Sequence, residues 1–470
     1  MKSGNFKFKF YVMCFLIFPV FAITLYSCDE DIKKEIIFEA GVVDTIHFNY
    51  SNGGHITVPI KMDSVTYDFT FDTGAHTTHF DTEIPIERIS NNTSSFFDYN
   101  GEKRATVKVW PEKIKIGNIA FLNFKDSKQN GLSIDGILGN NILRELCWAI
   151  DFRKSSIYVT EDISNLKIQL ENGLPFKLIG NNVHVTAQIG NDTVPLLIDT
   201  GDPSAAIRIN TSYLDEANMS NMIKWEYFRE SVNIYNEAKP VVEDVSYETI
   251  LPLRLGNRTY KDELVKFVDY REYAGVGLGF LSRFEQVIFD YPNRQLYFLG
   301  EGHKTVTFHI ETNEALNGSG IWIGLQDSLV VVKGLSNQAK NEGLKLGDAV
   351  LGIDDDIFPK NIENDFFQKQ KEMVEYINYK DGDSTIQSFE EIKNSKFMQL
   401  TKKFRNLDTV AVLKIKREDA DINLVIKPKE NFSDFPDTLQ TYTPLNLDFV
   451  GLFYSKGYWH NQPHIYITKK

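Results

Sequence analysis

The sequence predicts a mainly β protein that consists of two homologous β-lobes followed by a smaller α+β domain. Three observations lead to this prediction. Short runs rich in β-branched and aromatic residues alternate with turn signals over most of the chain, as is typical of strands. An Asp-Thr-Gly motif occurs twice, at residues 72–74 and 199–201, each time directly after an apolar run. Two further blocks follow each motif in the same order, which indicates an internal repeat.

The repeat sets the bounds of the two lobes. After the first motif come residues 135–143 and 149–159, and after the second come residues 275–281 and 287–298. We therefore assign residues 39–165 to lobe 1 and residues 166–302 to lobe 2. The 470 residues are long enough for these two cores and a third domain.

The first 27 residues are interpreted as an export signal. Three lysines precede an almost unbroken apolar run over residues 10–26, and Ser27 then precedes Cys28. This end resembles a bacterial lipobox, which implies cleavage before Cys28 and a lipid anchor on Cys28, with the body outside the cytoplasm, in the periplasm or on the cell surface. An uncleaved membrane anchor is the alternative, although the run is just short of a standard span. Residues 28–38 are expected to form a tether, whose acidic start resembles surface lipoproteins of the Bacteroides group.

Charge and cysteine content exclude several classes of partner and chemistry. Loss of residues 1–27 removes three lysines and no acid, so the formal net charge changes from −13 to −16. Such an acidic body argues against nucleic acid and anionic lipid surfaces as partners. After cleavage, Cys147 is the only cysteine besides Cys28, so no intramolecular disulfide is expected. Cys147 lies in an apolar run, which favours an inert core thiol over a catalytic one.

The two Asp-Thr-Gly motifs supply the parts of a water-activating carboxylate pair. Asp72 and Asp199 can share one proton if they lie close together, because two like charges at that distance cannot both ionise. Gly74 and Gly201 permit close approach of the opposite turn. Thr73 and Thr200 can donate hydroxyl hydrogen bonds across the pair and lock the turns together.

These motifs, together with the later glycine-containing elements at residues 137–139 and 276–279, resemble aspartic peptidases of the pepsin and retropepsin kind over residues 40–300. The resemblance implies a bilobal β-fold with one catalytic Asp per lobe and a cleft covered by a hairpin flap. It also implies that Gly139 and Gly279 lie in loops beneath the catalytic turns. Residues 96–101 are the expected flap, because Asn-Gly favours a hairpin turn. Tyr99 in that flap is either a substrate contact or an ordinary exposed aromatic residue.

Some positions leave two interpretations open. Asp202, where the resemblance implies Ser, Thr or Ala, either raises the pKa values of the dyad or points to solvent. His76 and His79 suggest a metal site beside the first motif, but this spacing does not share one face of a strand, so strand-flanking histidines are favoured. No cofactor and no metal are expected.

A third domain is expected over residues 303–430. Residues 342–354 resemble the central segment of PDZ domains, in which a helix is followed by Gly-Leu, Gly-Asp and a strand. That resemblance implies peptide capture by strand addition, with Gly318, Ser319, Gly320 and Ile321 as the cradle for a chain end. Packing or dimerisation is the alternative role. Residues 358–388 are interpreted as an insertion, and residues 431–470 as a C-terminal extension without an assigned role.

The predicted function is aspartic endopeptidase activity on a polypeptide substrate. One ionised Asp takes a proton from water, while the protonated Asp polarises the scissile carbonyl and later protonates the leaving amine. The two lobes of one chain complete the site, so a monomer is expected. Two alternatives remain. One is a noncatalytic peptide-binding lipoprotein, which an Asp72 or Asp199 substitution without effect would favour. The other is a scaffolding protein, which complexes that persist without residues 40–300 would favour.

Overall fold

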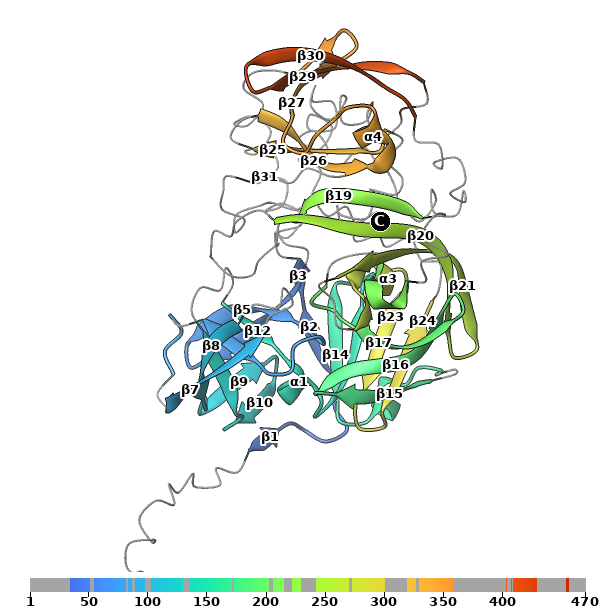
Figure 1. Cartoon of the computed structure of the whole chain (residues 1–470). Helices are drawn as coiled ribbons and strands as arrows, with labels where there is room; N and C mark the ends of the chain where they lie inside the picture. The colour runs from blue at the N-terminus through green and yellow to red at the C-terminus, as the bar shows by residue number, and fades with distance from the viewer. Residues whose placement is uncertain are drawn as a thin grey trace, which may run out of the picture.

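The computed structural model describes residues 34–50, 55–81, 83–86, 89–97, 103–129, 135–170, 173–202, 206–214, 222–229, 242–269, 273–300, 319–326, 329–358, 403, 407, 409–428 and 454–455. Strands dominate these residues and the helices are short, so the prediction of a mainly β fold is confirmed (Figure 1). The expected export signal, Cys28, Tyr99, Gly318 and most of the expected insertion lie outside the described residues. Within the described part of the chain, no helix has the length and apolar character needed to cross a membrane.

The first lobe is a sheet in which neighbouring strands are mostly antiparallel. Its strands are β1 (Glu35–Ile37), β3 (Asn49–Tyr50), β4 (Ile56–Met62), β5 (Val65–Phe71), β6 (His79–Asp81), β7 (Ile89–Phe97), β8 (Lys103–Val109), β9 (Lys113–Ile116), β10 (Ile119–Leu122), β11 (Asp126–Gln129) and β12 (Gly136–Leu138). Strand β1 pairs with β10, so residues 35–37, which we expected in the tether, belong to the sheet of this lobe. Helix α1 (Asn140–Leu143) follows β12.

The second lobe repeats this order of elements. Its strands are β16 (Asn182–Ile189), β17 (Asp192–Ile198), β18 (Ile207–Asn210), β19 (Ile223–Arg229), β20 (Val242–Leu255), β21 (Arg258–Val268) and β22 (Ala274–Val276), and helix α3 (Leu278–Leu281) follows β22. In both lobes the strand before the Asp-Thr-Gly motif pairs in parallel with the strand before the short helix, β5 with β12 and β17 with β22. Short 3-10 helices lie at Ile163–Leu166 and Thr211–Tyr213.

A central sheet joins the lobes. Its strands pair in the order β2, β14, β13, β23, β24 and β15. Their bounds are β2 (Asp44–His47), β14 (Ser156–Thr160), β13 (Cys147–Asp151), β23 (Gln286–Asp290), β24 (Gln295–Leu299) and β15 (Leu174–Ile179). Because β13 comes from the first repeat and β23 from the second, this pairing fixes the two lobes against each other.

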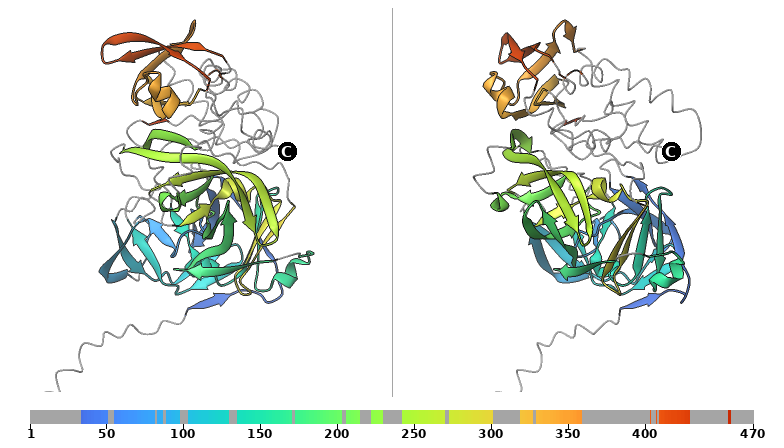
Figure 2. Two further views of the ribbon diagram at one scale, coloured as in Figure 1. Left: turned by 45° about the vertical axis from the view of Figure 1, so that its right-hand side comes forward. Right: turned by 90° about the vertical axis from the view of Figure 1, so that its right-hand side faces the viewer.

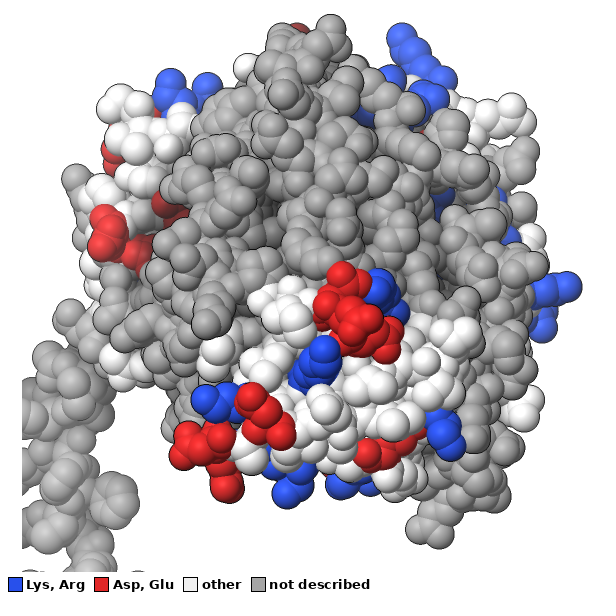
Figure 3. All heavy atoms as spheres, turned by 90° about the horizontal axis from the view of Figure 1, so that it is seen from above, with Lys and Arg blue, Asp and Glu red and all other residues white. Residues whose placement is uncertain are grey.

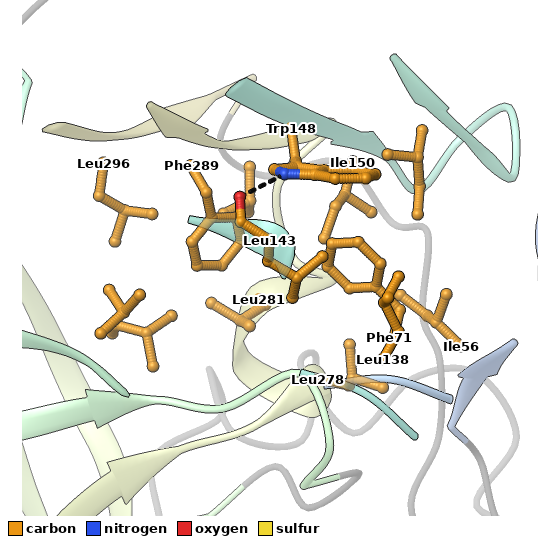
Figure 4. Packing of buried hydrophobic residues seen from close by; sticks show 14 of the residues in the cluster. Ile56, Phe71, Leu138, Leu143, Trp148, Ile150, Leu278, Leu281, Phe289 and Leu296 are labelled. Carbon is orange, nitrogen blue, oxygen red and sulfur yellow. Dashed lines mark hydrogen bonds between the residues drawn. The ribbon is translucent and has the colours of Figure 1, made fainter. Parts of the chain in front are cut away.

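One apolar core extends through both lobes and the central sheet. Figure 4 shows leucines of α1 and α3 packed with Trp148 and Phe289 of the central sheet. The Trp148 indole N–H donates to the Leu143 carbonyl over 2.6 Å, so this large side chain is buried without an unpaired donor. Burial of so many large apolar side chains provides the main stabilisation of the lobes.

The third unit follows lobe 2 and has a separate core. It contains β25 (Ile321–Gln326), β26 (Leu329–Ser336), α4 (Asn337–Asn341), β27 (Ala349–Ile353), β28 (Asp356–Ile357), β29 (Ala411–Arg417) and β30 (Ala420–Ile426), and β31 (Tyr454–Ser455) pairs in parallel with β25. Figures 1 and 2 show this unit beyond β19 and β20, on the side away from the central sheet. Seen from above, the acidic and basic side chains of the described residues lie interspersed on this face of the molecule (Figure 3).

Candidate active site

The two Asp-Thr-Gly turns leave the ends of β5 and β17 in equivalent ways. The Asp72 N–H donates to the Leu138 carbonyl over 3.1 Å, and the Asp199 N–H donates to the Val276 carbonyl over 3.0 Å. Each turn is therefore anchored to the strand that lies parallel to it. The backbone places both aspartates at matching positions of the repeat.

The threonines of the two turns bond to each other's backbone. The hydroxyl oxygen of Thr200 accepts from the Thr73 N–H over 3.0 Å and donates to the Phe71 carbonyl over 2.8 Å. The hydroxyl oxygen of Thr73 accepts from the Thr200 N–H over 3.0 Å and donates to the Ile198 carbonyl over 2.7 Å. Both threonines are fully buried, so these four bonds lock the turns together without competition from water.

Each carboxylate lies above the glycine of the opposite turn. A Cβ atom added to Gly201 would lie 2.3 Å from Cγ of Asp72, and one added to Gly74 would lie 2.3 Å from Oδ1 of Asp199. Each carboxylate also accepts from the glycine N–H of its own turn, over 2.7 Å for Asp72 and 3.0 Å for Asp199. Glycine is required at both positions because any side chain would displace the carboxylate.

The proximity of the two carboxyl groups changes their acidity. Burial and then the negative charge of Asp199 raise the pKa of Asp72 well above its usual range. The amide hydrogen bonds of Gly74 and Ala75 act in the opposite direction but are smaller. A proton is therefore retained on the pair at a pH where an isolated aspartate is ionised.

The loops beneath the turns contain Gly139 and Gly277. These two glycines precede α1 and α3 in the same extended backbone conformation, with φ values of −105° and −110°. A Cβ on Gly139 would lie 2.5 Å from the backbone of Thr77, so the chain passes there at close range. Gly279 was expected in the loop beneath the second turn, but it lies inside α3, so that prediction is wrong. Residues 275–281 contain three glycines, and the pairing of β17 with β22 shows that Gly277 is the one that matches Gly139.

A buried hydrogen-bond network under the first turn was not foreseen from the sequence. The Asn140 side-chain amide donates to the carbonyls of Thr73 and Ala75 over 2.6 and 3.1 Å. The Tyr291 hydroxyl donates to Oδ1 of Asn140 over 2.5 Å. The Asn182 side-chain amide donates to the Gly74 carbonyl over 2.7 Å. Burial and then the charge of Asp72 raise the pKa of Tyr291 well above its usual range.

The expectation that Asp202 could point to solvent is wrong. Asp202 is buried, and its Oδ1 lies 3.6 Å from Nη1 of Arg208. The ion pair offsets the cost of burying the carboxylate next to the second turn. Arg208 stands on β18, and no local sequence pattern indicates this pairing.

The histidines near the first turn are strand or loop residues. His79 stands on β6 and His76 is exposed in the preceding loop. Burial and then the positive charge of His76 lower the pKa values of His79 and of His184, on β16, to about 4. No group of three or more His, Cys, Asp or Glu side chains among the described residues is placed to hold a metal ion. Cys147 is buried in β13, and burial raises the pKa of its thiol above the usual range.

Each lobe carries a hairpin of two antiparallel strands that follows the strand after its Asp-Thr-Gly turn. In lobe 1 it is β7–β8, whose register pairs Phe97 with Lys103. Of the expected flap at residues 96–101, only residues 96 and 97 are described, so the expected Asn-Gly turn and Tyr99 lie outside the described residues. In lobe 2 the corresponding hairpin is β19–β20.

The outer strand of the lobe 2 hairpin pairs with the third unit. Strand β19 is antiparallel to β26, with Trp225 opposite Ser336 and Tyr227 opposite Gly334. The Lys340 ammonium donates to both carboxylate oxygens of Glu226 over 2.8 and 2.6 Å, and this contact lowers the pKa of Glu226. We call this pairing of β19 with β26 the flap seam.

The expected peptide cradle is partly occupied by its own side chain. Ser319 is buried, and its hydroxyl oxygen accepts from the Ile321 N–H over 3.1 Å. Gly320 has a φ of +65°, and its carbonyl accepts from the Ser336 N–H over 2.8 Å. The Ile321 amide is therefore already bonded, which is not what capture of a chain-end carboxylate requires.

The chain matches no protein-family model and no curated protein sequence. The geometry of the two turns is therefore what indicates a function for this chain.

Proposed function

We propose that the chain is an aspartic endopeptidase that hydrolyses peptide bonds with water activated between Asp72 and Asp199. One observation carries the proposal: the two carboxylates lie over each other's glycines while Thr73 and Thr200 bond reciprocally across the lobes. A fold that needed only two packed turns would not require two carboxylates in a buried, like-charged contact, which costs stability. A shared-proton dyad uses that contact.

The chemistry follows general acid–base catalysis. The ionised carboxylate accepts a proton from water as its oxygen attacks the scissile carbonyl carbon. The protonated carboxyl donates a hydrogen bond to the carbonyl oxygen, and the tetrahedral intermediate collapses as a carboxyl of the pair gives its proton to the leaving amine, which leaves one proton on the pair. No covalent intermediate with the protein forms, and the retained proton on the pair favours activity above the acid range of an isolated aspartate.

The third unit resembles a PDZ domain, and we propose that it positions the polypeptide rather than cleaving it. The support is the flap seam, which ties this unit to the β19–β20 hairpin of lobe 2. We further propose that Cys28 anchors the protein to a bacterial membrane, so that it acts outside the cytoplasm. An acidic, monomeric enzyme without a cofactor is consistent with these proposals.

The test is hydrolysis of a mixed peptide library from about pH 3 to about pH 8 by residues 29–470. Cleavage that an Asp72→Asn variant lacks, and that a statine-type transition-state mimic inhibits, is the expected result. A folded parent that cleaves no peptide at any pH contradicts the proposal and favours a noncatalytic peptide-binding module.

A further inference from the structure

Among the described residues, the hydrogen bond between Tyr291 and Asn140 lies under the first turn, and the matching positions at the second turn hold apolar residues that cannot form it. Asn140 occupies the position after the loop glycine, where the second copy has Leu278. Tyr291 follows the Asp at the end of β23, where the first copy has Phe152 after β13. Asn140 and Tyr291 meet each other, and their counterparts Leu278 and Phe152 belong to the shared apolar core. All four side chains are at most 1% exposed.

Leu278 and Phe152, the apolar counterparts of Asn140 and Tyr291, show that the fold does not require polar side chains at these positions. The same turn, short helix and strand are built at the second site with Leu278 from the second copy and Phe152 from the first copy at these places. Burying an amide and a phenol gains little over burying apolar groups of similar shape, even when the polar groups are hydrogen-bonded to each other. The polar pair at the first turn therefore has a purpose other than packing.

The contacts of Asn140 explain that purpose. The Thr73 carbonyl, which accepts from Asn140, belongs to the same planar peptide group as the Gly74 N–H, which donates to Oδ1 of Asp72. Holding the carbonyl therefore fixes the direction of the N–H. The Tyr291 hydroxyl in turn holds Oδ1 of Asn140, so the amide group cannot rotate away. The backbone N–H of Leu278 donates to the Asp202 carbonyl, as that of Asn140 does to the Ala75 carbonyl, but the Leu278 side chain has no donor for the Thr200 carbonyl.

We propose that Asn140 and Tyr291 are positioning residues that hold the peptide groups of the first turn and so fix Asp72 for the reaction. The inference rests on the proposed peptidase activity. Tyr291 comes from the second repeat and Asn140 from the first, so the geometry of Asp72 depends on the correct docking of the lobes. The two aspartates are thereby made unequal, although their turns are alike.

The direct test is the double variant Asn140→Leu with Tyr291→Phe. It installs at the first turn the apolar pair that the second turn already uses, so it is expected to fold with a cooperative thermal transition. Because the Gly74 N–H is no longer aimed at Asp72, kcat should fall roughly tenfold to a hundredfold while KM changes less than about threefold. The acid limb of the pH profile should move up by about half a pH unit, since a carboxylate that loses an aligned donor is harder to ionise.

A matched control is Tyr158→Phe on β14. This change also removes one phenolic oxygen from the central sheet, but that oxygen contacts only the exposed Lys154 ammonium, over 3.3 Å, among the hydrogen bonds described for it. Its kcat and pH profile should equal those of the parent. If the double variant does not fold, Tyr291→Phe alone serves the same comparison, with a smaller fall in kcat and a shift of the acid limb in the same direction.

The outcomes separate this inference from the proposed function. A folded double variant with the parental kcat and pH profile, alongside an inactive Asp72→Asn variant, overturns the positioning role and leaves the peptidase proposal intact. A parent that cleaves nothing overturns both. A fall in kcat with an unshifted acid limb indicates general structural damage and also overturns the positioning role.

Discussion

Substitution of Gly201 by alanine is the sharpest perturbation of the proposed dyad. The backbone at Gly201 lies outside the left-handed region, so alanine adds no backbone strain there. Its Cβ would lie 2.3 Å from Cγ and Oδ1 of Asp72. Ordinary contact begins near 3.4 Å, so the Asp72 carboxylate must move by about 1 Å. A displacement of that size costs roughly a hundredfold in rate, which corresponds to about 2.7 kcal/mol of activation free energy.

The assay is kcat on a single cleaved peptide, measured beside the free energy of unfolding in denaturant. Overpacking is expected to cost about 1–3 kcal/mol of stability. Gly41→Ala provides the control, because Gly41 has a φ of +76° and open space around its Cβ position. That variant should lose about 1–2 kcal/mol of stability through backbone strain and retain kcat. A Gly201→Ala enzyme with kcat within about threefold of the parent would refute the stacked arrangement of carboxylate and glycine.

Three further predictions concern other parts of the chain. Thr73→Val leaves the Thr200 N–H and the Ile198 carbonyl without their buried partner, so the free energy of unfolding should fall by about 2–4 kcal/mol. A variant whose free energy of unfolding in denaturant titrations equals that of the parent would contradict the cross-lobe bonds. The free energy of unfolding should also fall as the pH drops from about 6.5 to about 4. In this range the unfolded chain binds a proton at His184, whereas the folded chain, in which the pKa of His184 is about 4, does not. His184→Phe should remove up to about 3 kcal/mol of that pH dependence, and equal slopes in parent and variant would exclude this source. At the flap seam, Lys340→Glu puts a second carboxylate beside Glu226, so amide exchange over Ile223–Arg229 should accelerate while global stability changes by less than about 1 kcal/mol. Unchanged exchange there would show that this contact does not hold the seam.

The sequence predicted those features of the site that depend on residue identity within the repeat. The strand-turn pattern predicted the mainly β fold, and the paired Asp, Thr and Gly types predicted the reciprocal threonine bonds, because a buried hydroxyl beside another turn has few other partners. The second loop glycine was misassigned, since the letters Val-Gly-Leu-Gly fit two registers. The parallel pairing of β17 with β22, which continues in the bond from the Asp199 N–H to the Val276 carbonyl, selects Gly277.

Contacts between distant segments could not be predicted in this way. Asn140 and Tyr291 are separated by 151 residues, and nothing in either local sequence indicates that they meet. The asymmetry between the copies was visible, because Leu278 and Phe152 stand at the matching positions. That the two polar residues form a hydrogen bond beneath the first turn could be recognised only from the three-dimensional arrangement. The flap seam was equally hidden, because strand pairing between domains leaves no local pattern in β19.

The central claim is that both aspartates are needed in one proton-sharing pair. The most direct measurement compares the parent with Asp72→Asn and with Asp199→Asn on one cleaved peptide, with folding checked for each. Either substitution alone should lower kcat by roughly a thousandfold, because an amide can neither accept the proton from water nor share one with its partner. A folded variant of either aspartate that keeps the parental rate would contradict the two-aspartate mechanism.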